Sequence, residues 1–164
     1  MSRRFTHADR GTTLVELLTS MSIMAIMLAV ATSAFVSYRA SSEHSGARDT
    51  VVSTLRNASE RALSEQRTYC VSFSTSAWSL YRAACSGTGS VAIKTDVSLD
   101  AAQETMTGSF SHPAGHASAC GTGACVYFYP RGNSSDGTLT IRRDGRTDHV
   151  VDVEGLTSRV STSG

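Results

Sequence analysis

The sequence predicts an α+β protein in which a long N-terminal helix, transmembrane in its first half, packs on a small antiparallel β domain. Three observations predict this fold. Residues 17–36 form an apolar run without a charged side chain. Residues 51–63 place apolar side chains at helical spacing. From residue 68 onward, apolar residues alternate with polar ones at a period of two, which is typical of half-buried strands.

The apolar run, Leu17–Val36, is long enough for a membrane-spanning helix. At about 1.5 Å per residue it covers roughly 30 Å, the thickness of the hydrocarbon core of a bilayer. Three arginines, Arg3, Arg4 and Arg10, precede it, so the positive-inside rule predicts a cytoplasmic N-terminus and an extracytoplasmic C-terminal domain. Glu16 is a lone carboxylate at the start of the run. A charge within a membrane helix costs about 2.5–3.5 kcal/mol, which indicates that this residue has a partner and a function.

The next stretch, residues 39–67, is predicted to continue the helix in amphipathic form. Val51, Leu55, Ala58 and Ala62 follow one another at helical spacing and therefore share one face. Such a face must be buried on an apolar surface, which the following β domain provides.

Residues 68–164 are predicted to form the extracytoplasmic β domain. The clearest hairpin surrounds Asp144–Gly145, a residue pair that favours a tight turn. Strands are expected at Tyr69–Ser74, Trp78–Arg82, Thr105–Phe110, Val126–Tyr129, Thr138–Arg142, Thr147–Val153 and Leu156–Val160. Between about residues 83 and 124 the chain is rich in Ser, Gly, Ala and Thr and poorly patterned, which predicts a loop-rich insertion.

The four cysteines, Cys70, Cys85, Cys120 and Cys125, indicate disulfides, because small exported domains commonly gain stability from them. Three connectivities are possible. Cys120 and Cys125 close a short loop, which favours the pairs Cys120–Cys125 and Cys70–Cys85.

A metal site is the alternative use of these thiols. His112 and His116 lie just before Cys120 and Cys125, and all four are side chains that bind zinc. Their spacing differs from that of standard zinc fingers, and thiols outside the cytoplasm tend to oxidise. Disulfides are therefore the favoured interpretation, and no metal or other cofactor is predicted.

Composition and motifs argue against nucleic-acid binding by the whole surface and against catalysis. The 15 basic and 14 acidic residues leave a net charge of +1, so there is no global basic field. Neither a Gly-x-Ser-x-Gly nor a His-Glu-x-x-His motif is present. We expect a protein that is not an enzyme.

The segment Gly11–Glu16, followed by the apolar run, resembles the class III leader junction of type IV pilins and pseudopilins. The resemblance implies that residues 1–11 are a leader, that prepilin peptidase cleaves between Gly11 and Thr12 and methylates Thr12, and that residues 12–38 form the helix of the membrane and of the filament core. It also implies that Glu16 meets the N-terminal amine of a neighbouring subunit. Two residues depart from the pattern: Thr12 replaces the usual phenylalanine, and Ser33 stands where a proline is common.

The rest of the chain resembles one branch of these proteins, the GspH/FimT family. The resemblance rests on the helix segment Leu55–Ala62, the strand beginning Trp78-Ser79-Leu80, and the stretch Phe128–Gly132 with the strands that follow it. It implies two antiparallel sheets on the helix and a minor subunit of a type II secretion pseudopilus or a type IV pilus. The implied location is the inner membrane, and the implied partners are other pilin subunits, prepilin peptidase and the membrane.

Two other functions remain open at this point. Some members of the family act in DNA-uptake pili and bind DNA through C-terminal basic residues. Arg142, Arg143, Arg146 and Arg159 are the candidates for such a contact here, although acidic residues of the same segment offset their charge. The second alternative is a simple membrane-tethered β domain with an unrelated partner.

Overall fold

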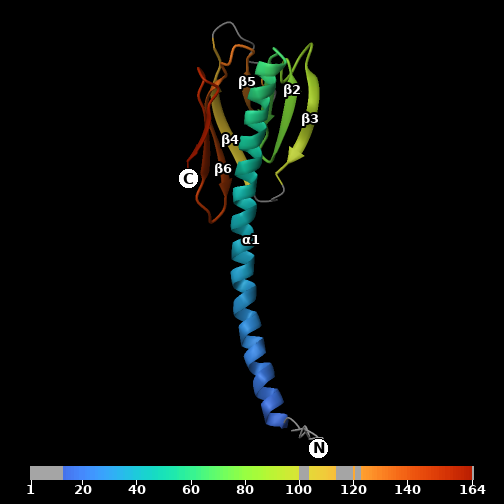
Figure 1. Cartoon of the computed structure of the whole chain (residues 1–164), viewed down its shortest axis with the longest axis vertical. Helices are drawn as coiled ribbons and strands as arrows, with labels where there is room; N and C mark the ends of the chain where they lie inside the picture. The colour runs from blue at the N-terminus through green and yellow to red at the C-terminus, as the bar shows by residue number, and fades with distance from the viewer. Residues whose placement is uncertain (1–12, 100–103, 114–119, 121–122, 164) are drawn as a thin grey trace, which may run out of the picture. The chain divides into compact units, whose positions relative to one another are not determined.

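The computed structural model of the chain describes residues 13–99, 104–113, 120 and 123–163. The chain divides into two compact units, Met1–Ala40 and Ser41–Gly164. The described residues form one helix and eight strands (Figure 1).

Helix α1, Leu14–Ser64, runs without interruption from the first unit into the second, through Ser45 and Gly46. It begins directly after Thr13, whose Oγ1 accepts the Glu16 N–H at 3.3 Å and so caps the first turn. The single long helix predicted from the apolar run and the amphipathic stretch is therefore present.

The first sheet of the second unit has the strand order β3-β2-β1-β5, and all neighbours are antiparallel. The strands are β1 (Tyr69–Phe73), β2 (Ala77–Arg82), β3 (Val91–Ser98) and β5 (Ala124–Phe128). The predicted hairpin of β1 and β2 is confirmed, with Phe73 paired to Trp78 at its turn. Strand β3 lies in the stretch for which the sequence predicted loops.

The second sheet has the order β4-β6-β7-β8, again antiparallel throughout. Its strands are β4 (Glu104–Ser111), β6 (Asp136–Arg143), β7 (His149–Val153) and β8 (Val160–Ser163). Gly145 has a φ of +73° in the turn between β6 and β7, as the Asp-Gly pair predicts. The last strand begins at Val160, not at Leu156, because residues 155–157 form a turn first.

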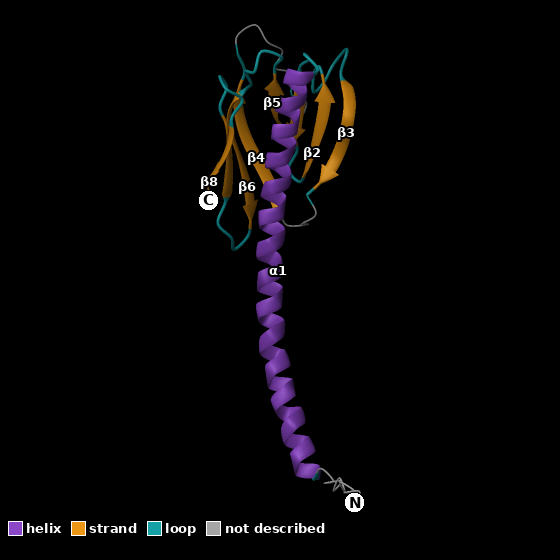
Figure 2. Ribbon diagram, viewed as in Figure 1, coloured by secondary structure: helices purple, strands orange, loops and turns teal. Residues whose placement is uncertain are grey.

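The core lies where the second part of α1 meets both sheets (Figure 2). From the helix it takes the predicted face, which includes Val51, Leu55 and Ala58. From the sheets it takes the side chains Tyr69, Val71, Phe73, Trp78, Leu80, Val126, Phe128, Leu139, Ile141, Val151 and Val153. The helix therefore holds the two sheets together through one continuous apolar contact.

Replacing Leu55 by alanine is expected to lower the free energy of unfolding by about 2–5 kcal/mol, because Leu55 is fully buried and its loss leaves a cavity. Leu63→Ala is the matched control, since Leu63 lies on the same helix but is 46% exposed. Denaturant unfolding of the full chain in detergent micelles measures both, with the near-UV signal of Trp78 as the reporter. Equal effects of the two substitutions would contradict the assignment of this helix face to the core.

Candidate functional site

The first unit presents an apolar helix surface. Between Glu16 and Arg39 the helix carries no charged side chain, and every one of its large apolar residues is exposed. These exposed residues are Leu17, Leu18, Met21, Ile23, Met24, Ile26, Met27, Leu28, Val30, Phe35, Val36 and Tyr38. By length and composition this helix is able to cross a membrane. Such a surface requires either lipid or other apolar helices around it.

Five hydroxyl side chains of this segment are compatible with insertion into lipid, because they return their hydrogen bonds to the helix backbone. Thr19, Ser20 and Ser22 donate to carbonyl oxygens three or four residues earlier, at 2.8–3.0 Å. Thr32 and Ser33 do the same at 3.0 and 2.9 Å. The helix therefore satisfies these five hydroxyl groups itself, as a membrane environment requires.

Glu16 is the sole charged residue between Thr13 and Tyr38, all of which lie in the described part of the chain. It occupies the first turn of α1, where the helix dipole favours a negative charge. Its position three residues after the capping Thr13 is that of the acidic residue in a capping box. Gly11 and Thr12, the predicted cleavage site, lie outside the described residues.

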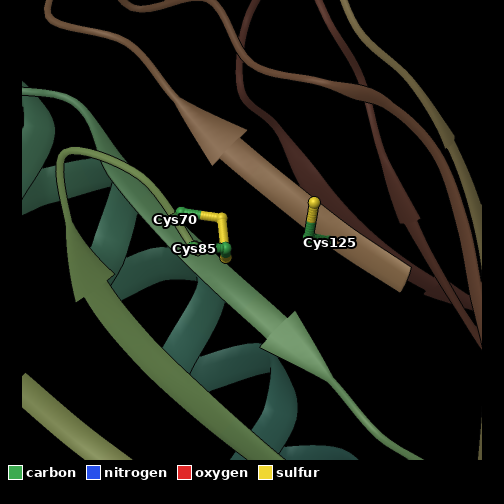
Figure 3. A group of neighbouring side chains, drawn as sticks. All are labelled: Cys70, Cys85 and Cys125. Atoms are coloured by element: carbon green, nitrogen blue, oxygen red, sulfur yellow. A yellow bond between two sulfur atoms is a disulfide. The ribbon is translucent and has the colours of Figure 1, made fainter. Parts of the chain in front are cut away.

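Both predicted disulfides are present. Cys70 on β1 is joined to Cys85, which follows β2, with their Cα atoms 5.4 Å apart. Cys120 is joined to Cys125 on β5, with a Cα separation of 5.5 Å. The two bridges meet: the sulfur atoms of Cys70, Cys85 and Cys125 lie within 4.8 Å of one another (Figure 3).

The metal alternative has part of its ligand set in one place. His112, Cys120 and Cys125 have ligand atoms within 4.8 Å of one another. The two cysteines are bonded to each other, however, and metal ligation requires thiolates. His116 lies outside the described residues.

A buried ionic cluster joins α1 to the second sheet, and the sequence did not predict it. His44 Nδ1 lies 2.9 Å from a carboxylate oxygen of Glu104, whose side chain is fully buried. Arg143 contacts the same carboxylate at 3.5 Å and that of Glu43 at 3.4 Å. The cluster therefore ties two consecutive helix residues, Glu43 and His44, to β4 and β6.

Further contacts fix the His44 ring on both sides. Its Nε2 lies 3.0 Å from the Thr147 carbonyl oxygen, which can only accept a hydrogen bond, so Nε2 carries a hydrogen. The ring stacks on that of His149, with centroids 4.3 Å apart. With Nε2 donating, the contact between Nδ1 and Glu104 needs one further proton, shared by this buried pair.

The candidate DNA-contact arginines are engaged differently from one another. Arg142 forms an exposed ion pair with Asp148 at 2.9 Å, and its hydrogen bond lowers the pKa of that carboxyl. The Arg143 side chain is only 11% exposed and belongs to the buried cluster. Arg146 is half-buried and Arg159 is exposed. The guanidinium groups of Arg142 and Arg143 therefore already face carboxylates.

The sequence holds one weak signal for the buried cluster. His44 is a polar residue seven positions before Val51, so it lies on the extension of the apolar helix face. Its partner, Glu104, is 60 residues away and follows a stretch without clear patterning. A polar residue on an apolar face predicts a buried partner, but the position of that partner depends on the tertiary fold.

Comparison with known proteins agrees with the motif and with the fold. Residues 6–32 match the family model of the prokaryotic N-terminal methylation motif. A comparison with curated protein sequences gives no significant match.

The chain is similar to solved structures of two proteins. The type IV minor pilin FimU of Pseudomonas aeruginosa superposes with a TM-score of 0.56 at 16% identity, covering 75% of this chain and 90% of FimU. The minor pseudopilin EpsH of the Vibrio cholerae type 2 secretion system gives a TM-score of 0.55 at 10% identity, covering 73% of this chain and 94% of EpsH. The chain therefore has a pilin-like fold. It carries the N-terminal methylation motif and has the fold of minor pilins and pseudopilins.

Breaking the buried cluster is expected to destabilise the second unit. His44→Ala and Glu104→Gln should each lower the free energy of unfolding by about 3–5 kcal/mol, because each leaves a buried partner uncompensated. The double variant should lose less free energy of unfolding than the two single variants added together, because both single variants remove the same contact.

Arg142→Ala is the matched control for these variants, because it removes an exposed ion pair of the same sheet. Its unfolding midpoint should stay close to that of the parent chain. Additive effects of His44→Ala and Glu104→Gln would show that the two side chains are not energetically coupled.

Proposed function

We propose that this protein is a minor subunit of a pilin-type filament, in a type II secretion pseudopilus or a type IV pilus. Prepilin peptidase cleaves it between Gly11 and Thr12 and methylates Thr12. Until assembly it is held in the inner membrane by the first part of α1, with its N-terminus in the cytoplasm and its β domain outside. The protein acts in filament assembly and carries out no enzymatic reaction.

One observation carries the proposal. The methylation motif, residues 6–32, includes Gly11, Glu16 and most of an uncharged, exposed helix surface in a chain with the pilin fold. The similarity of the chain to a minor pilin and to a minor pseudopilin supports the filament class. It fits a type IV pilus and a type II secretion pseudopilus equally. The three arginines before the motif support the proposed membrane orientation.

Glu16 is assigned to subunit contact within the filament. An exposed carboxylate at the end of an apolar surface loses its hydration when that surface is covered by other helices. The positively charged amine that cleavage creates on a neighbouring subunit would compensate this loss. Without such a partner, a carboxylate in the apolar region costs about 2.5–3.5 kcal/mol, and the helix dipole offsets only part of this.

The test is the incorporation of the Glu16→Ala variant into filaments in the native host. We expect this variant to be cleaved and membrane-bound. Its amount in sheared filament fractions should be no more than about a tenth of the parent level, because the loss of a buried ion pair shifts the assembly equilibrium roughly tenfold or more. Glu60→Ala is the matched control, because Glu60 is an exposed acid on the same helix in the second unit. Equal incorporation of Glu16→Ala, Glu60→Ala and parent chains would refute the role assigned to Glu16.

A further inference from the structure

The two disulfides form one sulfur cluster whose members differ in access to solvent. Cys70 is fully buried, Cys85 is 8% exposed and Cys125 is 1% exposed. Cys120 is half-buried and is the most accessible of the four. The Cys70–Cys85 bridge is thus nearly enclosed, with Cys125 beside it (Figure 3). Cys125 is in turn bonded to Cys120, the most accessible cysteine.

This arrangement limits how the enclosed bridge can form in the folded chain. Thiol–disulfide exchange requires a thiolate to reach a disulfide sulfur and to pass through a mixed disulfide. Cys70 has no exposed surface and Cys85 only 8%, so an external disulfide reaches this bridge less readily than it reaches the more exposed Cys120. The Cys125 sulfur, in contrast, already lies within 4.8 Å of both Cys70 and Cys85.

We propose that the folded chain contains an internal disulfide relay, in which the Cys120–Cys125 bridge takes oxidising equivalents from an external disulfide and passes them to Cys70 and Cys85. The external reactant is a disulfide of the exported-protein environment, either a small molecule or a disulfide oxidoreductase. The activity is independent of whether the protein joins a filament.

The transfer consists of two exchange steps that balance. The Cys85 thiolate attacks Cys125 Sγ, which forms a Cys85–Cys125 bond and releases Cys120 as a thiolate. The Cys70 thiolate then attacks Cys85 Sγ, which forms Cys70–Cys85 and releases Cys125 as a thiolate. The two protons lost by Cys70 and Cys85 balance those taken up by Cys120 and Cys125. The external disulfide then re-oxidises Cys120 and Cys125 and is itself reduced to two thiols.

Backbone geometry selects Cys85 as the first attacking residue. Cys70 and Cys125 lie on neighbouring strands, where Cys70 pairs with Tyr127 and Cys125 with Ser72. Residues in this diagonal relation have Cα atoms about 7–8 Å apart, beyond the usual disulfide range of about 4.4–6.8 Å. Cys85 lies after the end of β2, outside the paired strands, and its N–H donates to the Tyr127 hydroxyl of β5 at 3.3 Å. This contact holds Cys85 beside the strand that carries Cys125. The final bridges, with Cα separations of 5.4 and 5.5 Å, fall within the normal range.

His112 is placed to assist the release of Cys120. Its Nε2 lies 3.9 Å from Cys120 Sγ, and its Nδ1 lies 2.7 Å from Ser135 Oγ. Ser135 Oγ accepts the Tyr127 N–H, so its own hydrogen is available for Nδ1. When Nδ1 accepts this hydrogen, a neutral imidazole carries its own hydrogen on Nε2, facing the departing sulfur. Burial lowers the pKa of His112, which favours the neutral ring.

The first test follows re-oxidation of the wild-type full chain in micelles. The chain is fully reduced, its native near-UV signal from Trp78 is verified, and glutathione disulfide is added. Free thiols are then alkylated at intervals, and the linkages are mapped by peptide mass. We expect Cys120–Cys125 first, then a transient Cys85–Cys125 linkage, and Cys70–Cys85 last. Two results would overturn the relay: Cys70–Cys85 forming while Cys120 and Cys125 are both still thiols, or a reduced chain without native signal.

The second test removes the entry point of the relay. In the Cys120→Ser variant, formation of Cys70–Cys85 from the folded, reduced chain should slow by about tenfold or more, because the remaining route depends on direct access to buried thiols. The Ser86→Ala variant, which leaves all four thiols in place, should re-oxidise at the wild-type rate. In denaturant, where access is equal, the difference between Cys120→Ser and wild type should disappear. Equal rates in the folded state would overturn the proposal.

Discussion

The structure depends on the burial of one stripe of α1 against two sheets at once. Val51, Leu55 and Ala58 have no exposed surface, and their partners come from strands of both sheets. The sheets also contact each other, for example where the Met106 N–H of β4 donates to the Thr75 carbonyl in the turn between β1 and β2. Because apolar burial is the main favourable term in folding, this shared helix contact is what makes the two sheets one core.

The two parts of α1 require different surroundings. Leu14–Val36 exposes apolar side chains around the whole helix, whereas the part from His44 to Ala62 buries one face and leaves polar residues on the other. The ionic cluster of Glu43, His44, Glu104 and Arg143 lies near the start of this second part. Its charges add directional contacts where the apolar stripe begins, since a buried hydrogen-bonded pair specifies one arrangement of helix and strand.

Local patterns in the sequence predicted the elements with strong periodicity. The uncharged run, the helical spacing of Val51 and Leu55, and the Asp144–Gly145 turn each depend on neighbouring residues alone. Strand β3 was missed because all but one of its residues are exposed, so its sequence shows no alternation between core and solvent. It is held by backbone pairing to β2, with a bulge between Trp78 and Tyr81, and such pairing leaves little trace in side-chain pattern.

Contacts between distant residues set the limit of prediction at the site. The short loop from Cys120 to Cys125 indicated the disulfide pairing, but the meeting of the two bridges depends on β5 lying beside β1. Likewise, no local feature places Glu104 beside His44, since the contact requires β4 to lie next to the helix. Sequence alone could name the residues of the N-terminal motif, because they are neighbours along the chain and their spacing predicts that Thr12 and Glu16 share one helix face.

The central claim is that this chain is a processed subunit of a pilin-type filament. The mass of the N-terminal peptide, measured on protein extracted from native membranes, tests it most directly. The account predicts a chain that begins at Thr12 and carries a methyl group on its amine. A chain that begins at Met1 or Ser2 would contradict it, and the protein would then be a membrane-tethered β domain with the pilin fold.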